Sequence, residues 1–549
     1  MIDIIVEYYG ESYERLLEKY EASQIMRINE RYVVVSGNPG AMPDYSYVNY
    51  EYSQIPKCYG LMVSDHLEEI GVVEVRQNPN LTLRGQGILI GIVDTGIDYK
   101  NSLFQYADGT TKIVALYDQE LERRFTRENI NLALKSQNPE QIVPSKDTNG
   151  HGTYIAGVIA GNEVEDGTFS GVAPDSELVV VKLKQADPLL RQFYHINENA
   201  DAYSEADIMR GIQYLLSVAE VSQKPIAIFV GLGTNQGGHD GRGPLNEYLL
   251  ETTDLSAVAV TVAGGNEGLE RRHFYGEGLS NADTQSGNSS NVQDIEISVG
   301  ADVPGFTMEL WGYAPNRYSV GITSPGGRVV ERSIARIRET REIRFLLEET
   351  VIQLSTDIVE RSSGDQVIIF QFEKPTEGIW TIQVYEEGIG GLGFHCWLPI
   401  SNFLQEDTYF LSSNPYTTIT CPGNAKTLIT VEAYDYNNMS LVPNNSRGFS
   451  RINDIKPELV APGVNITGPG LRNNFVTKTG SSVAAAQVCG ITALLLEWGI
   501  LRGNQSNMDG VVIRNYLIRG AVRNPNNTYP NRRWGFGVVN IYKTFVQLD

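Results

Sequence analysis

The chain has 549 residues, of which 41% are hydrophobic, so it can bury a large core as one big domain or as several smaller ones. Its 44 basic and 66 acidic residues give a formal net charge of −22. A protein this acidic is repelled by phosphate backbones and by anionic lipid surfaces, which argues against nucleic-acid binding and a membrane-surface role.

The N-terminus and the cysteines bear on the compartment in which the protein works. Residues 1–20 lack a basic stretch followed by an apolar one, so we expect no signal peptide and synthesis in the cytoplasm. The absence of a run of about 18 apolar residues predicts no membrane span. The four cysteines are scattered without a CxxC pair, which favours free, buried thiols. With no convincing Asp-rich loop either, we expect neither a metal nor a cofactor.

The N-terminal part of the chain, up to about residue 65, predicts a small α/β unit. A breaker cluster, Ser-Gly-Asn-Pro-Gly, follows at residues 36–40, and a Tyr-rich connector comes after it. The expected elements are three strands and one amphipathic helix, at residues 2–6, 11–20, 23–28 and 31–35.

The pattern changes at about residue 66. Continuous apolar runs, typical of strands that are buried on both faces of a parallel sheet, alternate with helical stretches up to about residue 285. The runs lie at residues 88–93, 178–183, 226–230 and 257–262, and the helices at 151–160, at 205–220 and after Pro244. We therefore predict an α/β fold with a doubly wound parallel sheet.

Between about residues 286 and 413 helical signals fade and short alternating stretches take over. This pattern is typical of an all-β sandwich of roughly a hundred residues. Strands are expected at residues 306–313, 317–322, 342–355, 366–372 and 379–385. From residue 414 to 549 the α/β pattern returns, with a strand at 427–435 and a helix from Ser482 to about Trp498. The β module is therefore inserted into the α/β domain.

Four short motifs carry side chains suited to chemistry. Asp94 ends a buried strand in IVDTGID, at the sheet edge where such folds place their sites, although an Asx turn would also explain it. His151 opens a helix between two glycines in NGHGT. Ser482 begins a small-residue helix whose N–H groups could stabilise an oxyanion, although N-cap serines are common. Asn266 follows a buried strand in AGGNEG and could equally be a turn residue.

Taken together, in the order Asp, His, Asn, Ser, these motifs resemble those of the subtilisin-like serine proteases. The signatures are matched by IVDTGID, NGHGTYIAG and GSSVAAA, and the similarity extends over about residues 70–300 and 415–549. The resemblance implies a catalytic triad of Asp94, His151 and Ser482. In such a triad the histidine takes the serine proton, and the aspartate orients the imidazole and stabilises the imidazolium.

The family pattern Gly-[Thr/Ser]-Ser places the nucleophile third, so Ser482 is chosen over its neighbour Ser481. There are two departures from the family pattern. Ala486 stands where proline is usual, and Tyr154 stands where histidine is common. Neither position does chemistry, so the departures leave the predicted activity intact.

The resemblance also implies how substrate is held. The Asn266 amide and the Ser482 backbone N–H would receive the oxyanion. The predicted substrate contacts are Gly231, Leu232 and Gly233, which would pair with extended substrate, and Gly264 and Gly265, which would line the pocket for the residue before the scissile bond.

For domain organisation, the resemblance implies a prodomain at residues 1–65 that acts as intramolecular chaperone and inhibitor. The cut that releases it is expected between about residues 50 and 66, and an ordinary N-terminal subdomain is the alternative. The catalytic domain would comprise residues 66–285 and 414–549, and a jelly-roll-like module would occupy 286–413.

A narrower resemblance, carried by VRQNPNLTLRGQGILIGIVDTGIDY and by the β insert, is to clostridial subtilases that include the Csp spore germination proteases. It implies a serine endopeptidase that processes its own prodomain, becomes part of the spore and activates a cortex-lytic enzyme precursor during germination. Its partners would be a protein or peptide substrate and its own prodomain. The alternative function is that of a scaffold or signalling homologue whose triad serves only self-cleavage.

Overall fold

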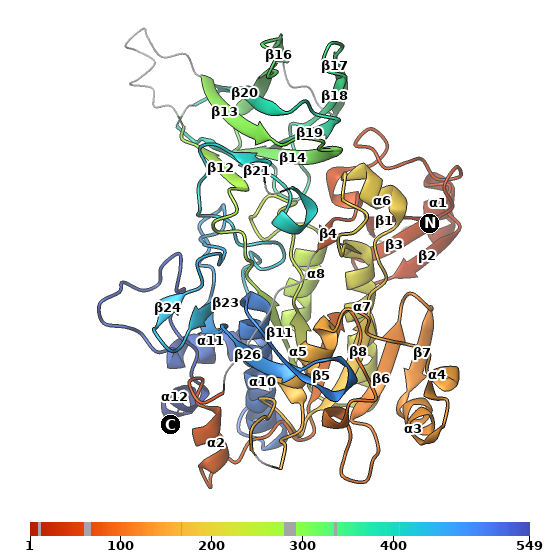
Figure 1. Ribbon diagram of the computed structural model, residues 1–549, viewed down its shortest axis with the longest axis vertical. Helices are drawn as coiled ribbons and strands as arrows, with labels where there is room; N and C mark the ends of the chain where they lie inside the picture. Colours follow the sequence, from red (N-terminus) through yellow and green to blue (C-terminus); the bar gives the residue numbers. More distant parts are fainter. Residues whose placement is uncertain are drawn as a thin grey trace.

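A computed structural model describes residues 1–8, 12–59, 67–165, 167–278, 292–333, 338–389, 391–405 and 407–548. Three parts are visible in Figure 1: an α/β body, a pair of β-sheets at the top of the view, and a small red unit at the side that contains the N-terminus.

The body is built on a nine-stranded sheet of order β24-β23-β11-β10-β5-β8-β6-β7, with β25 paired to β23. The strands from β6 to β23 along this order pair in parallel, whereas β7 and β24 are antiparallel at the edges. The strand bounds are β5 (Leu89–Asp94), β6 (Ile113–Asp118), β7 (Arg123–Thr126), β8 (Glu177–Lys182), β10 (Ile226–Val230), β11 (Val258–Ala263), β23 (Ile429–Asp435), β24 (Ser440–Leu441) and β25 (Leu459–Pro462).

Helices cover both faces of this sheet, which explains the continuous apolar runs. Along β5, Ile90 and Ile92 belong to one core cluster and Leu89 and Val93 to the other. Because successive side chains of a strand point to opposite faces, both faces must be apolar. The first face packs against α2 (Val72–Gln77), α5 (His151–Ala160), α10 (Ser481–Leu496), α11 (Gly510–Gly520) and α12 (Ile541–Val546), and the second against α7 (Glu205–Ser222) and α8 (Pro244–Thr253).

Helix α10 runs through the core and continues into a π-helical turn, η5 (Glu497–Leu501). By length and composition the stretch Ser481–Leu501 could cross a membrane, and the sequence analysis had excluded such a segment. However, 89% of its most apolar window is buried inside the protein. Together with the core contacts of Val483 and Leu494 this identifies it as a core helix.

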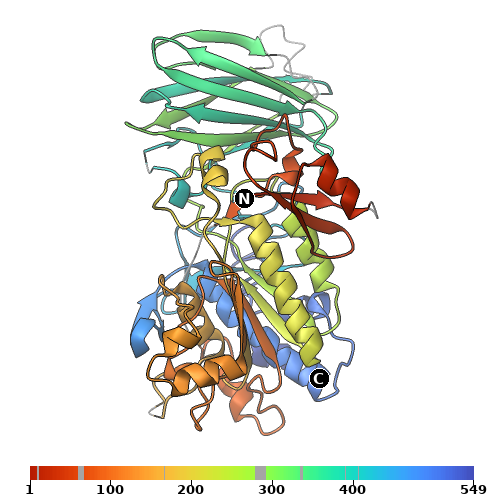
Figure 2. The same ribbon diagram turned by 90° about the vertical axis from the view of Figure 1, so that its right-hand side faces the viewer.

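The inserted module consists of two antiparallel sheets, drawn as stacked layers at the top of Figure 2. Their orders are β12-β21-β14-β19-β18-β17 and β16-β15-β20-β13-β22. The strand bounds are β12 (His273–Gly276), β13 (Val292–Val299), β14 (Gly305–Gly312), β15 (Arg317–Thr323), β16 (Val329–Ser333), β17 (Glu339–Phe345), β18 (Thr350–Asp357), β19 (Gln366–Glu373), β20 (Gly378–Glu387), β21 (Phe394–Trp397) and β22 (Tyr409–Phe410).

One expectation for this module needs correction. Residues 342–355 were expected to be one stretch, but they form a hairpin of β17 and β18. The turn contains Leu346 and Leu347, which are 76% and 96% exposed. These leucines extend the apolar pattern without entering the core, so the pattern hid the turn.

The N-terminal unit has the three strands and one helix that were expected, and its strands form an antiparallel sheet of order β1-β3-β2. Its elements are β1 (Ile2–Glu7), α1 (Tyr13–Lys19), β2 (Gln24–Arg27) and β3 (Tyr32–Gly37). In Figure 2 it lies beside α7 and α8, below the inserted sheets. Ile5 and Val34 share the core cluster of α7, and the Asp3 carboxylate lies 2.8 Å from the Arg210 guanidinium.

Several short elements complete the fold. They are η1 (Tyr52–Gln54), β4 (Cys58–Tyr59), η2 (Ser102–Phe104), α3 (Arg127–Lys135), α4 (Pro139–Ile142), α6 (Pro188–Phe193), β9 (Tyr203–Ser204), η3 (Ser401–Phe403), β26 (Ile466–Pro469), η4 (Leu471–Asn473) and β27 (Phe475–Lys478). Cys58, Cys396, Cys421 and Cys489 are free thiols, and all four are buried.

Candidate active site

Asp94 and His151 meet at the carboxyl end of the central sheet. Asp94 is the last residue of β5 and His151 the first of α5. The Nδ1 atom of His151 lies 2.8 and 2.9 Å from the two carboxylate oxygens of Asp94. A Cβ on Gly152 would lie 2.1 Å from the Gly96 carbonyl oxygen, so only glycine lets the helix approach the strand this closely.

Asp147 holds the end of β5 and the start of α5 together, and the sequence analysis did not single it out. Its carboxylate accepts the Thr95 and Thr153 hydroxyls and the backbone N–H groups of Asn149, Gly150 and Thr153, at 2.7–3.1 Å. The Thr95 hydroxyl oxygen also accepts the Gly152 N–H at 2.9 Å. Asp147 thus caps the start of α5 and ties it to the residue after Asp94.

Ser481 and Ser482 occupy the first turn of α10 and differ in their contacts. The Ser481 hydroxyl accepts the Gly265 N–H at 3.3 Å, which gives it a structural contact. The Ser482 hydroxyl donates to the Gly231 carbonyl oxygen at 3.3 Å, and a Cβ on Gly231 would lie 3.3 Å from that hydroxyl. The N-cap residue, Gly480, has no side chain, so the N-cap itself satisfies none of the first N–H groups of α10.

Asn266 follows β11 and lies beside this helix start. Its side-chain oxygen accepts the Ser481 N–H at 3.4 Å, so the amide N–H₂ group remains available as a donor. Because α10 contributes the positive end of its dipole here, the Asn266 amide and the first turn of α10 together suit a developing negative charge.

The two predicted substrate-binding segments meet at Thr420. Its backbone N–H and hydroxyl donate to the Gly264 carbonyl oxygen at 2.8 and 3.1 Å. A Cβ on Gly233 would lie 2.3 Å from the Thr420 hydroxyl oxygen, and one on Gly265 would lie 3.0 Å from its methyl group. Thr420 therefore lies between the two segments, and it comes so close that a larger side chain at Gly233 or Gly265 would crowd it. Leu232, which stands between Gly231 and Gly233 in the sequence, is fully buried.

Sequence reasoning missed Asp147 and Thr420 for different reasons. Asp147 stands four residues before His151, and an acidic residue just before a helix start is a recognisable capping signal. Thr420 reaches the site only through tertiary packing across the inserted module. Of the two family departures, Tyr154 is buried and donates its hydroxyl to the Ile466 carbonyl oxygen at 2.9 Å, and Ala486 is buried within α10.

In the full chain this site is closed. Asp94, His151 and Ser482 are at most 1% exposed. Beside the site, β4 pairs antiparallel with β9, which places Tyr59 opposite Tyr203. Asn149, two residues before His151, donates its amide to the Asp201 carboxylate at 2.8 Å, and Asp201 stands two residues before Tyr203, so this pairing lies near the site. Burial, with the negative charges of Asp201 and Asp94, raises the pKa of Tyr203.

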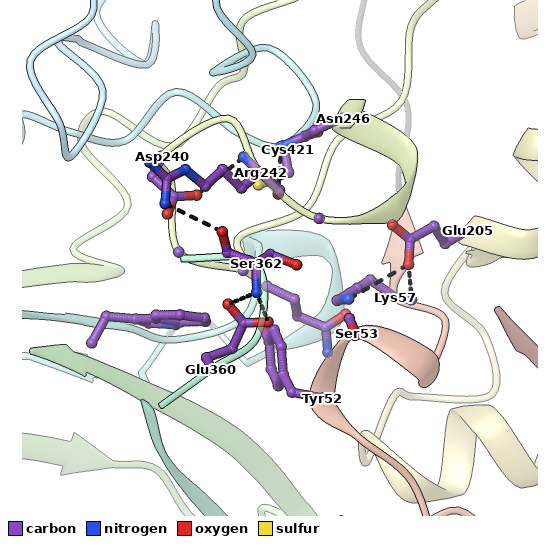
Figure 3. Close-up of a pocket in the computed structure, with 15 residues that line it drawn as sticks. Tyr52, Ser53, Lys57, Glu205, Asp240, Arg242, Asn246, Glu360, Ser362 and Cys421 are labelled. Carbon is purple, nitrogen blue, oxygen red and sulfur yellow. Dashed lines mark hydrogen bonds and ion pairs between the residues drawn. The ribbon is translucent and has the colours of Figure 1, made fainter. Parts of the chain in front are cut away.

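The β4 segment is anchored mainly through its backbone. The Glu205 carboxylate accepts the Lys57 N–H at 3.2 Å, and the Glu205 N–H donates to the Lys57 carbonyl oxygen at 2.7 Å. The Gln236 side chain accepts the Cys58 N–H at 3.1 Å. Figure 3 shows Lys57 and Glu205 facing each other in a small pocket that Tyr52 and Ser362 also line.

A buried carboxyl group, Glu309 of β14, joins all three parts of the molecule. It accepts the Tyr52 hydroxyl at 2.6 Å, the Gly237 N–H at 3.0 Å and the Trp311 indole N–H at 3.0 Å. Burial raises the pKa of Glu309. The N-terminal unit, the body and the inserted module therefore share one anchoring point.

The arrangement is suited to acyl transfer: a hydroxyl at a helix start, an imidazole held by a carboxylate, and a side-chain amide beside the same helix start. Within the described ranges, no cluster of three or more His, Cys, Asp or Glu side chains is placed to hold a metal ion.

Comparison with known proteins agrees with this chemistry. A model of the subtilase family (peptidase S8) matches residues 85–323 and 402–537. The solved structure of the Clostridium perfringens CspB protease is similar with a TM-score of 0.77 and 32% identity, over 88% of this chain and 98% of that one.

Two curated relatives match over shorter lengths. An intracellular serine protease of Paenibacillus polymyxa is 29% identical over 36% of this chain and 47% of its own length. The serine protease AprX of Bacillus subtilis is 27% identical over 36% of this chain and 37% of its own length. The aligned part thus spans less than half the length of either relative.

Proposed function

This chain belongs to the subtilase family of serine proteases, and we propose that it hydrolyses peptide bonds through Asp94, His151 and Ser482. The observation that carries the proposal is the contact of His151 with Asp94 at 2.8 Å, together with the helix start that presents Ser482.

In the proposed mechanism His151 removes the proton of Ser482 as its hydroxyl oxygen attacks the scissile carbonyl carbon. Asp94 keeps the other imidazole proton on Nδ1 and stabilises the imidazolium that forms. The Asn266 amide and the Ser482 N–H donate to the oxyanion. His151 then protonates the leaving amine, and water attacks the acyl-enzyme by the reverse route.

We further propose that the N-terminal unit is a prodomain that the chain cuts off itself between about residues 50 and 66. Support comes from β4, which is paired as an added strand next to the site, and from the closure of the triad in the full chain. A strand that enters a protease cleft in this way is positioned as a product would be.

Intact-mass spectrometry of the wild type and of Ser482→Ala tests this proposal. We expect two fragments from the wild type, with the cut between about residues 50 and 66, and a single full-length chain from the variant. Full-length chains in both would refute self-processing, and fragments in both would assign the cut to another protease.

The physiological substrate that we propose is the precursor of a spore cortex-lytic enzyme, with the protein synthesised in the cytoplasm and incorporated into the spore. The similarity to the CspB protease over 88% of this chain supports this role. Incubation of the processed wild type with the purified precursor should give one specific cut. An uncut precursor, together with hydrolysis of a test peptide, would reject this substrate but keep the protease.

The closed triad also favours a second candidate, a scaffold that cleaves only itself. The two candidate functions differ in whether the processed protein cleaves other proteins. Processed wild type should digest an added unfolded protein such as casein if it is an endopeptidase. A processed but inactive protein would support the scaffold.

A further inference from the structure

Three segments of the chain lack acidic residues although the chain as a whole is acidic. Residues 408–431, 436–453 and 510–548 contain no Asp or Glu, in a chain where acidic residues outnumber basic ones by 66 to 44. Side chains from all three segments come together in the structure. We call this group the arginine platform, and it consists of Arg447, Arg532, Arg533, Tyr416 and Phe449.

Aromatic rings organise the platform. The Arg532 guanidinium lies 5.3 Å from the ring centre of Tyr416 and 5.2 Å from that of Phe449, and the Arg447 guanidinium lies 6.0 Å from the Tyr416 ring centre. These are cation–π distances, which hold the planar cations in fixed positions. Arg532 and Arg533 are exposed.

The charges of the platform are not neutralised from within. In the described part of the chain, no carboxylate forms an ion pair or hydrogen bond with the guanidinium groups of Arg447, Arg532 or Arg533. Burial, together with the charge of Arg533, lowers the pKa of Arg447, as expected for cations that repel one another. Elsewhere in this chain exposed arginines such as Arg338 and Arg344 do meet carboxylates.

The platform adjoins the site through the backbone. The Arg447 N–H donates to the Thr418 hydroxyl at 2.8 Å, two residues before Thr420. The neighbouring Ser446 donates its N–H to the Gly265 carbonyl oxygen at 3.0 Å and accepts the Glu267 N–H on its hydroxyl at 3.1 Å. These contacts flank Asn266, so the backbone that carries the platform adjoins the proposed oxyanion site.

We propose that the arginine platform docks an acidic segment of the protein substrate, an inference that rests on the proposed protease function. Arginines bind carboxylates through paired N–H donors, and cations without an ion-pair partner at the edge of a binding surface accelerate association with an acidic partner. At physiological salt the Debye length is about 8 Å, so a docked segment responds to these arginines rather than to distant carboxylates. A long polyanion such as a nucleic acid would extend beyond the platform onto acidic surface and be repelled.

The test compares the wild type with the double variant Arg532→Glu/Arg533→Glu. The matched control is Arg317→Glu/Arg341→Glu, which makes the same change in net charge on exposed arginines of the inserted module. The binding probe is a fluorescein-labelled Asp-rich peptide, followed by anisotropy at low salt. We expect about tenfold weaker binding to the platform variant and about wild-type binding to the control.

Hydrolysis separates this inference from the proposed function. Two peptides share a cleavable sequence from residues 50–66 and carry either a short Asp tail or an Asn tail. In processed wild type the Asp tail should raise kcat/KM through a lower KM, and about 0.5 M salt or the platform variant should abolish the gain.

Equal kcat/KM values for the two peptides, or equal losses of peptide binding in both double variants, would overturn the platform proposal. Hydrolysis of the Asn-tailed peptide would still support the proposed protease function. Tighter binding of a single-stranded oligonucleotide than of the Asp-rich peptide would also overturn it. If neither peptide is cut, the proposed function fails, and the anisotropy measurement still decides whether the platform binds acidic chains.

Discussion

At the scale of single residues, Asp147 connects two motifs that lie far apart in the sequence. Its carboxylate accepts five hydrogen bonds, from Thr95 and from the start of α5. We infer that it positions His151 against Asp94 without touching the substrate. A positioning role of this kind predicts a loss of turnover rather than of binding.

Asp147→Ala should therefore lower kcat about 10–100-fold on a neutral peptide with little change in KM. It should also reduce stability, because several donors of a buried turn lose their acceptor. Asp147→Asn retains one carbonyl oxygen and should recover part of kcat. Steady-state kinetics on processed protein checks this, and an unchanged kcat in the alanine variant would contradict the positioning role.

Asn266 gives a second prediction at this scale. Its side-chain oxygen is held by the Ser481 N–H, which leaves its N–H₂ group as a donor. Asn266→Ala should lower kcat by about 10²–10³ with KM nearly unchanged, because the lost hydrogen bond forms mainly in the transition state. Ser481→Ala, which removes the contact with Gly265 and leaves the Asn266 amide in place, serves as the control. A loss confined to KM would exclude Asn266 from the oxyanion site.

At the scale of elements, a few buried polar groups join the N-terminal unit to the rest of the molecule, in addition to its apolar contacts with α7. Tyr52 donates to Glu309 of the inserted module, and β4 pairs with β9 of the body. Tyr52→Phe removes one of three donors to a buried carboxyl group and should weaken retention of the cleaved unit by about 1–2 kcal/mol.

Size-exclusion chromatography of processed protein in increasing urea measures this retention. Tyr50→Phe is the matched control, because the Tyr50 hydroxyl donates to Pro43 within the same unit. The Tyr52 variant should release the unit at lower urea than the control. Release at the same urea concentration would show that Glu309 does not anchor the unit.

The sequence predicted the elements that repeat a simple pattern. Strands such as β5 and β10 are buried on both faces, so their apolar runs identified them directly. It did not predict β6 and β7, because β6 carries Tyr117 and Asp118 in a mixed pattern and β7 begins with two arginines. The motifs located Asp94, His151 and Ser482, whereas Thr420 and Glu309 depend on contacts between segments that are distant in the sequence.

At the scale of the whole molecule, buried histidines join the body to the inserted module. His239 of the body stacks on Trp397 of β21 at 4.1 Å, and His273 and His395 lie 2.8 Å apart beside it. Burial lowers the pKa of His239 to about 4 and that of His273 to about 3. Arg451, whose side chain is fully buried, further lowers the pKa of His239 and His395.

The molecule should therefore lose stability in acid. Above pH 6.5 these histidines are neutral in the folded and unfolded states alike. Below it the unfolded chain binds protons that the folded chain does not, so stability falls between about pH 6.5 and pH 4. The slope is up to about 1.4 kcal/mol per pH unit for each histidine.

Urea unfolding followed by tryptophan fluorescence at several pH values checks this prediction. His239→Gln, which cannot titrate, should show a smaller loss between pH 6.5 and pH 4 than the wild type. The comparison is needed because Glu267 acts in the opposite sense: burial raises its pKa to about 7, so its contribution is lost as the pH rises. Equal slopes in the two proteins would reject the role of His239.

The central claim is that Ser482, activated by His151 and Asp94, is the nucleophile of a serine protease. Labelling with a fluorophosphonate and mapping of the adduct by peptide mass spectrometry tests it most directly, on processed protein from which the N-terminal unit has been separated. We predict an adduct on Ser482 in the separated wild type and none in the same protein denatured before labelling. An adduct on Ser481, or no adduct on the separated wild type, would contradict the account.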